Sequence, residues 1–183
     1  MPTFAASVAT YVVLLMLVAA GVTRARRPDE LPAALRAHGV LPGAAVPAAA
    51  TGVAVIEVTL AVMASAGLAG VPGLLEAGLT GTAALFAGIG GYGWHVVASG
   101  RSGPCGCGGV AAPMSGWVAG RAAVLAALAL LALGVVTARG SDVVVRPAEF
   151  GAELAIVALA AGTFAALLWS LPAAMVDREA AVR

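Results

Sequence analysis

The apolar residues of this chain come in blocks that are too long for the helices of a soluble core. Residues 4–22, 77–100 and 154–176 each contain no charged side chain. About 20 consecutive apolar residues cross the hydrocarbon layer of a bilayer as an α-helix. Because lipid offers no hydrogen bonds, each span must satisfy its backbone internally. The pattern therefore predicts an all-α fold, a polytopic membrane helix bundle.

The blocks predict five membrane spans within a single membrane domain, residues 1–183. The spans cover about residues 4–22, 46–67, 75–98, 117–137 and 153–174. Pro47 fits the start of the second span and Pro172 the end of the fifth. Val71-Pro72-Gly73 predicts a short turn, so the second and third spans should be antiparallel neighbours. We interpret the fifth span as an appendage to a four-helix core.

Composition agrees with a membrane protein. The chain is 61% hydrophobic and 10% charged, whereas soluble domains are about 25% charged. A net charge of +1 argues against a nucleic-acid partner. The spans are rich in Ala and Gly, which allow membrane helices to approach closely. Close packing also explains the glycines of residues 88–93, since this G-x-G-x-x-G lacks the strand and the acidic residue of a dinucleotide site.

The arginines predict how the chain crosses the membrane. Eight of them fall on one predicted side: Arg24, Arg26, Arg27, Arg36, Arg101, Arg121, Arg178 and Arg183. The other side has Arg139 and Arg146. Because cytoplasmic segments carry the excess of positive charge, we expect a multi-pass cell-membrane protein with its N-terminus outside. The loop between the third and fourth spans would then face the cytoplasm.

That loop contains the only two cysteines, Cys105 and Cys107, in the stretch GPCGCGG. Two cysteines separated by one residue reach disulfide geometry only with a distorted backbone, which Gly106 between them tolerates. A strained disulfide is easily reduced, and Arg101 is placed to favour a thiolate at Cys105. We therefore expect Cys105 and Cys107 to be a catalytic, redox-active pair.

Three other interpretations of the cysteines stay open. Two thiolates with His38 or His95 would suit zinc or Cu(I), but the usual ligand spacing and a second ligand pair are missing, so we assign no metal site. A metal-handling or small-solute transporter would use Glu57 and glycine-rich helices to line a path. A non-catalytic assembly factor would not need the cysteines.

Four further residues are candidates for supporting roles. Glu57, in the middle of the second span, is costly to bury; it either accepts a proton during thiol exchange, pairs with Arg121, or holds helices together. Arg121 either anchors the loop or snorkels to the headgroups. His95 can transfer protons beside the thiols, although an interfacial position beside Trp94 is the favoured interpretation. His38 is expected to be a solvated loop residue.

Several features follow one another in a characteristic order: RRPDELPAALRAHGVLP, Glu57 within the second span, PCGCGG, and then Ser115 and Arg121. In this order, over about residues 27–131, the chain resembles the MauE family of methylamine-utilisation membrane proteins and, in outline, DoxX-like small membrane proteins. It departs from the family at Gly108, where an aromatic residue is frequent, and at Ala122, where asparagine is frequent.

The resemblance implies a four-helix MauE/DoxX-like core and a role in disulfide formation. MauE is thought to support maturation of the disulfide-rich small subunit of methylamine dehydrogenase, together with a thioredoxin-like partner, MauD. We therefore expect a thiol–disulfide relay, an oxidoreductase that acts on an exported protein. No cofactor beyond the redox-active disulfide is assigned, and quinone use stays open. A re-entrant cysteine loop would reconcile extracytoplasmic maturation with the arginine pattern.

Overall fold

The fold is a bundle of long α-helices. A computed structural model describes residues 2–101, 103–106, 113–148 and 151–181, except for the side chains of residues 172–173 and 176–181. Its helices are α1 (Pro2–Arg26), α2 (Glu30–His38), α3 (Val46–Leu68), α4 (Leu74–Ala98), α5 (Gly116–Arg139) and α6 (Ala152–Ala181), with short 3-10 turns η1 (Gly43–Ala45) and η2 (Ser141–Val143). The described residues contain no β-strand, which confirms the all-α prediction.

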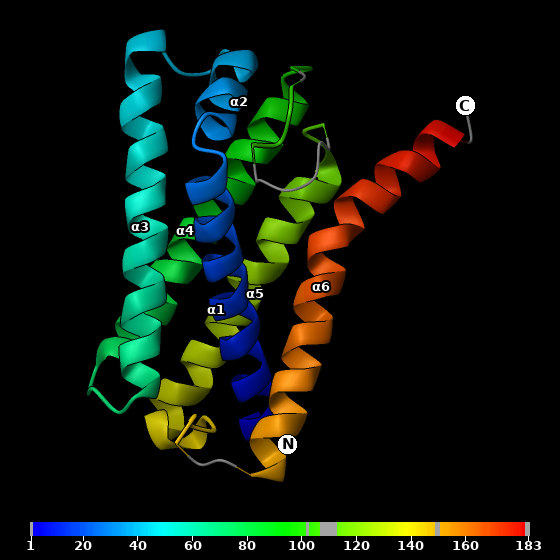
Figure 1. Ribbon diagram of the computed structural model, residues 1–183. Coiled ribbons are helices and arrows are strands. Elements are labelled where there is room, and N and C mark those ends of the chain that lie inside the picture. Colours follow the sequence, from blue (N-terminus) through cyan, green and yellow to red (C-terminus); the bar gives the residue numbers. More distant parts are fainter. Residues whose placement is uncertain (1, 102, 107–112, 149–150, 182–183) are drawn as a thin grey trace.

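Five of these helices are long and apolar enough to span a bilayer: α1, α3, α4, α5 and residues 152–171 of α6. Their bounds agree with the predicted spans to within a few residues, except at the end of α6. The predicted helix end at Pro172 is wrong, because α6 continues to Ala181 and bends away from the bundle in its last part (Figure 1). A proline inside a helix removes one amide donor and bends the helix, but it does not always end it.

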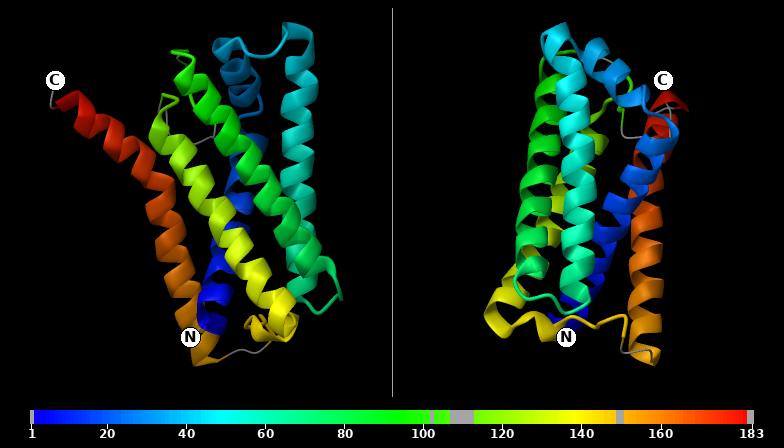
Figure 2. Two further views of the ribbon diagram at one scale, coloured as in Figure 1. Left: turned by 180° about the vertical axis from the view of Figure 1, so that it is seen from behind. Right: turned by 60° about the vertical axis from the view of Figure 1, so that its left-hand side comes forward.

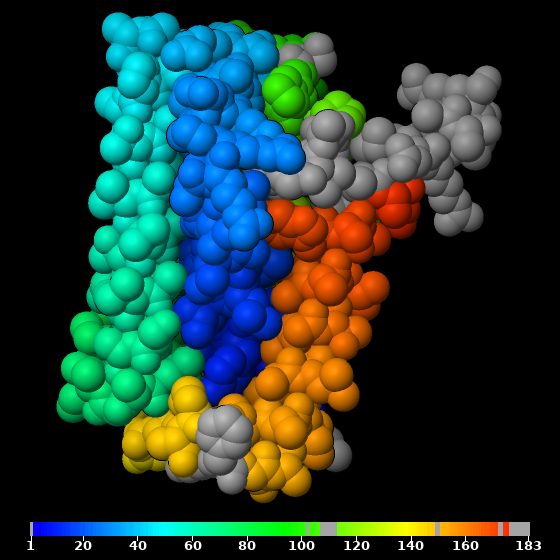
Figure 3. All heavy atoms as spheres, viewed as in Figure 1, coloured from blue at the N-terminus to red at the C-terminus, as the bar shows by residue number. Residues whose placement is uncertain are grey.

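The long helices form a four-helix core with one helix added on the outside. α4 packs against α3 and α5, and α1 packs against α3, α5 and α6. Two further views show α6 along one flank of the bundle (Figure 2), and the surface view shows it lying against α1 (Figure 3). It buries Val157, Ala161 and Leu168 there. The arrangement confirms the prediction of a four-helix core plus a fifth membrane helix.

Small residues allow α3 and α4 to approach closely near the turn that joins them. A methyl group added at Gly67 would overlap the backbone nitrogen of Leu75, and one added at Gly78 would lie 3.0 Å from the backbone nitrogen of Ala64. The chain reverses between them at Gly73, which has a left-handed φ of 73°. The short turn and the antiparallel pair are therefore as predicted.

The glycines of residues 88–93 differ in what they contact. Methyl groups added at Gly90 or Gly93 would lie 3.5 Å from α5, beside Ala119 and Ala122. These two glycines are buried and confirm the expected close packing. Gly88 has no neighbour within 4 Å of an added methyl group, because it borders a cavity.

Large apolar side chains cover the outside of the bundle. Val55 and Val62 of α3 are 58% and 61% exposed, and Leu159 and Leu167 of α6 are 74% and 59% exposed. A soluble monomer rarely exposes contiguous apolar surface of this kind, whereas lipid solvates it. The outer surface therefore agrees with a multi-pass membrane protein.

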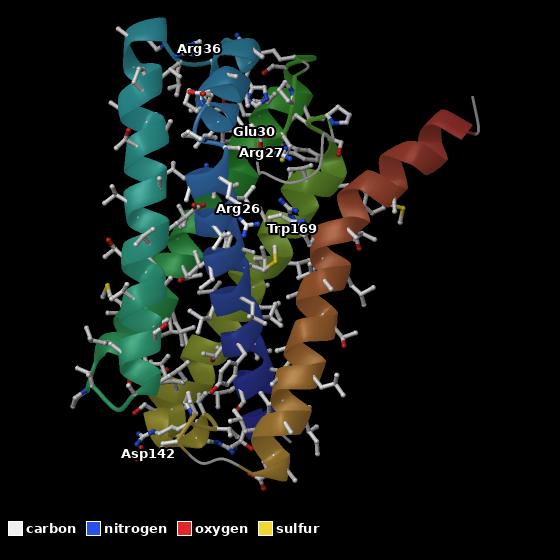
Figure 4. All side chains as sticks on the ribbon, in the orientation of Figure 1. Arg26, Arg27, Glu30, Arg36, Asp142 and Trp169 are labelled. Carbon is white, nitrogen blue, oxygen red and sulfur yellow. The ribbon has the colours of Figure 1, made fainter. Side chains whose placement is uncertain are left out.

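Figure 4 labels charged side chains in the half of the bundle that carries α2 and one, Asp142, at the opposite end. Arg26, Arg27 and Arg36 lie at the end that carries α2, where Arg27 forms an exposed 2.8 Å ion pair with Glu30. Asp142 lies at the opposite end (Figure 4) and pairs with an arginine of the same segment. The segregation agrees with the arginine count, and the direction of insertion stays a prediction.

We predict that the α3–α4 contact is intolerant of a single added methyl group. Gly67→Ala should destabilise the protein by ~1–3 kcal/mol, because the new Cβ meets backbone atoms that cannot rotate away. Gly52→Ala, on the same helix with open space around it, should leave stability unchanged or raise it slightly. Thermal unfolding in detergent measures both. Equal melting temperatures for the two variants would contradict the packing described.

Candidate functional site

A cavity of about 480 Å³ lies within the bundle, at the end that carries α2. Every α-helix contributes to its wall, which is mainly apolar. The polar, charged and sulfur-bearing side chains on this wall include Arg24, His38, Glu57, Tyr92, Cys105 and Arg121. A volume of this size suits a small organic ligand. The cavity is therefore the candidate site.

The connection between α4 and α5, residues 99–115, is called here the cysteine loop. At its base, Pro104 and Pro113 form an isolated antiparallel bridge, and the Met114 amide donates a 2.8 Å hydrogen bond to the Gly103 carbonyl. Cys105 follows directly, is 8% exposed and lies on the cavity wall. Its sulfur is disulfide-bonded. Cys107 lies outside the described residues.

Gly106 holds the cysteine loop against α2. Its φ of 64° is in the left-handed region, which glycine adopts without steric cost. A methyl group added there would lie 2.7 Å from Cβ of Ala34 and 3.3 Å from a methyl carbon of Leu31. The distorted backbone predicted at Gly106 is present, and the residue is needed for contact with α2 as well.

His38 is buried and joins three parts of the site. The expectation of a solvated loop residue is wrong: His38 is 2% exposed, on the apolar face of α2 that also carries Ala34 and Leu35. Its Nε2 lies 3.0 Å from the carbonyl oxygen of Pro104, and its Nδ1 lies 3.1 Å from the hydroxyl of Tyr92. Because a carbonyl only accepts, Nε2 carries a proton, and in the neutral ring Nδ1 accepts from Tyr92.

With both ring nitrogens engaged, His38 is not available as a metal ligand in this arrangement. Within the parts of the chain that the structure describes, no three His, Cys, Asp or Glu side chains gather as a metal ion would need. The imidazole instead positions the residue before Cys105.

Arg101 fastens the start of the cysteine loop to the end of α2. Its guanidinium donates to the carbonyl oxygen of His38 at 3.2 Å and to that of Gly39. Positive charge is favourable at the C-terminus of a helix, where carbonyls lack partners. The observed role is therefore positioning, and the proposed effect of Arg101 on the Cys105 thiolate stays a prediction.

Glu57 forms a buried ion pair with Arg24. Nε and Nη2 of Arg24 donate to the two carboxylate oxygens at 2.6 and 2.7 Å, and only 2% of the Glu57 side chain is exposed. The hypothesis that Glu57 pairs with Arg121 is wrong. Such a bidentate pair is strong and directional, so it fixes α1 against α3. Nη1 of Arg24 is buried without a hydrogen-bond partner.

Arg121 lines the same cavity from α5. Its guanidinium carbon lies 5.8 Å from the ring centroid of Trp169 on α6, a distance at which an aromatic face attracts a cation. No carboxylate of the described residues pairs with it. The cavity wall thus has two guanidinium groups and one carboxylate, a surplus of positive charge.

His95 takes no part in this wall. It is exposed on α4 beside Trp94, which is 66% exposed. Of the residues predicted to act together, the structure brings Cys105, Glu57 and Arg121 to one cavity. It places Arg101 at the edge of the site and His95 outside it.

Sequence reasoning missed Arg24, Tyr92 and Trp169 as parts of the site, and it considered His38 there only as a metal ligand. A signal existed for His38, because Ala34, Leu35 and His38 share one face at helical spacing. Arg24 was counted only as an orientation charge. Its position, two residues beyond the uncharged block of residues 4–22, does not reveal which carboxylate it meets.

In a comparison with known protein families, the model described as "Methylamine utilisation protein MauE" matches residues 2–137. The match includes α1 to α4, the cysteine loop and nearly all of α5, and hence every cavity residue named here except Trp169. No curated protein matches the chain, and no solved structure matches it either.

We predict that Arg24, and not Arg121, is energetically coupled to Glu57. Glu57→Ala should destabilise the protein by about 3–5 kcal/mol, because it leaves Arg24 buried without a counter-charge. The same change should cost far less in an Arg24→Ala background, while its cost should be unchanged in an Arg121→Ala background. Melting temperatures of the variants in detergent give the coupling. Coupling to Arg121 alone would contradict the observed pair.

A second prediction separates the two reasons for a glycine at position 106, its left-handed φ and its close contact with Ala34 of α2. Gly106→Ala should be more destabilising than Gly100→Ala, which has a similar φ of 66° but open space around it. The control should cost only the left-handed strain, roughly 1–2 kcal/mol. In an Ala34→Gly background the excess cost at Gly106 should disappear, because the opposing methyl group is gone. An excess that persists there would rule out the α2 contact as its cause.

Proposed function

Because the chain belongs to the MauE family of methylamine utilisation proteins, we propose that it is a membrane thiol–disulfide relay. In this proposal Cys105 and Cys107 form a reversible disulfide that supports disulfide formation in an exported protein. The observation that carries it is the placement of Cys105 on the wall of a cavity within the bundle, at a backbone position fixed by His38 and Gly106.

The fixed backbone around Cys105 favours chemistry over an incidental cysteine. Surface loops are usually mobile and loosely packed, whereas this one is bonded to a buried imidazole and pressed onto α2. Thiol–disulfide exchange requires the attacking and leaving sulfurs to approach in line, so a positioned sulfur reacts with less loss of entropy. The contacts of α2 supply that positioning.

The reaction has two exchanges. A thiolate of the partner attacks the relay disulfide, forms a mixed disulfide and releases one relay thiol. The second partner thiol then resolves it, so that the partner loses two electrons and two protons and the relay gains them. Because Cys105 is 8% exposed, we assign the mixed disulfide to Cys107 and the internal position to Cys105.

The partners proposed here are those that the resemblance to the MauE family implies. A thioredoxin-like protein similar to MauD and an exported disulfide protein, such as the small subunit of methylamine dehydrogenase, are the proposed reactants. The arginine pattern predicts a cysteine loop on the cytoplasmic side, and with that orientation electrons from an exported partner would need a path through the bundle. The cavity beneath Cys105 is the part of the molecule suited to such a path.

We predict opposite behaviour for the two single cysteine variants. With the partner in its disulfide form, the Cys107 thiolate of Cys105→Ser should attack that disulfide, release one partner thiol and accumulate as a mixed disulfide, because Cys105 is missing to resolve it. Cys107→Ser should form no adduct, and neither variant should oxidise the reduced partner. Acid-quenched, alkylated cells analysed by non-reducing electrophoresis and mass spectrometry report both effects. The double serine variant is the control without adducts. Full partner oxidation in all three variants would favour a non-catalytic assembly factor instead.

A further inference from the structure

The cavity offers hydrogen-bond donors to a ligand and few free acceptors. Both oxygens of Glu57 are taken by Arg24, and both nitrogens of His38 are engaged. The groups left over are Nη1 of Arg24, buried without a partner, and the guanidinium of Arg121. A buried donor without an acceptor costs about 1–3 kcal/mol. A ligand that only accepts hydrogen bonds would relieve this cost.

The rest of the wall favours a ligand with an apolar part. Val53, Leu85, Phe86 and Ile89 line the cavity, and Trp169 adds an aromatic surface beside Arg121. Hydrophilic anions such as phosphate would lose their hydration against these side chains. The ligand should therefore combine acceptor oxygens with an apolar ring and reach the bundle from the lipid.

We propose that this cavity binds the head group of a membrane quinone, which reoxidises the cysteine pair; the proposal rests on the relay function above. A quinone has two carbonyl oxygens that only accept hydrogen bonds, a flat ring and an apolar tail. An acyl lipid would also satisfy the guanidinium groups, but it cannot take electrons. The sulfur of Cys105 on the same wall favours the quinone.

The reaction balances without a further reactant. Two S–H bonds of the reduced pair break and one S–S bond forms, while two O–H bonds form on the ring, so that the quinone becomes a quinol. Two electrons and two protons pass from sulfur to oxygen. A guanidinium that donates to a carbonyl oxygen stabilises the negative charge that develops there. Arg24 and Arg121 are thus the residues expected to bind the ring.

The test uses purified full-length protein in lipid nanodiscs, with a benzoquinone carrying one isoprene unit as the probe. Quenching of tryptophan fluorescence gives its Kd, and absorbance gives the rate of quinol formation by the reduced protein. Arg121→Ala should weaken binding roughly tenfold or more, as expected for one lost charge-assisted hydrogen bond. Arg139→Ala, an exposed arginine at the other end of α5, should leave both quantities unchanged.

Two further variants keep the test decisive. Val53→Phe fills the cavity without removing a charge, so it should weaken binding even where Arg121→Ala fails to fold. The double cysteine-to-serine variant should bind the probe normally but form no quinol.

The two proposals fail in distinguishable ways. If the probe does not bind, or if Arg121→Ala and Val53→Phe leave its binding unchanged, the quinone site is overturned. Trapped partner adducts would still support the relay in that case. Arg121-dependent binding of oleate, with no quinol formed from the quinone, would identify an acyl-lipid cavity and also overturn it. Quinol formation that persists without the cysteines would separate any quinone chemistry from the relay.

Discussion

The carboxylate of Glu57 lies among apolar helices, where a lone charge would be costly, and its stability depends on the two hydrogen bonds from Arg24. That pair ties the last turn of α1 to the middle of α3. It also uses only two of the three guanidinium nitrogens, so Nη1 stays without a partner. One interaction therefore fixes α1 and α3 beside the cavity and leaves one guanidinium nitrogen of Arg24 without an acceptor.

The cysteine loop depends on a segment distant in sequence. α2 lies between the first two spans, yet it provides the contacts for Gly106, the imidazole that bonds Pro104, and the carbonyls that accept from Arg101. The position of Cys105 is therefore set more by α2 than by the loop's own composition. Glycine gives the loop freedom, and packing against α2 removes it.

Most of the fold was predictable, because long uncharged blocks allow only helices in lipid and Val71-Pro72-Gly73 allows only a short turn. The pairs that side chains form with one another were harder to predict from the sequence. In a soluble helix the polar face marks what points outward, whereas α3 is apolar around its whole circumference, so nothing in its sequence shows where Glu57 points. The burial of His38 was missed for a different reason: His38 was interpreted as a solvated residue of the loop between two spans, although it shares one helix face with Ala34 and Leu35.

The family match ends at residue 137, yet the cavity continues beyond it to α6. Without α6, the guanidinium of Arg121 would lose the ring of Trp169, 5.8 Å away, and that side of the cavity would meet lipid. A cation–π contact in a desolvated site is worth about 2 kcal/mol, which offsets part of the cost of a buried arginine. The added helix therefore completes the cavity wall beside Arg121. The charged residues of the site come from the four-helix core, whereas α6 helps to close the cavity off from lipid.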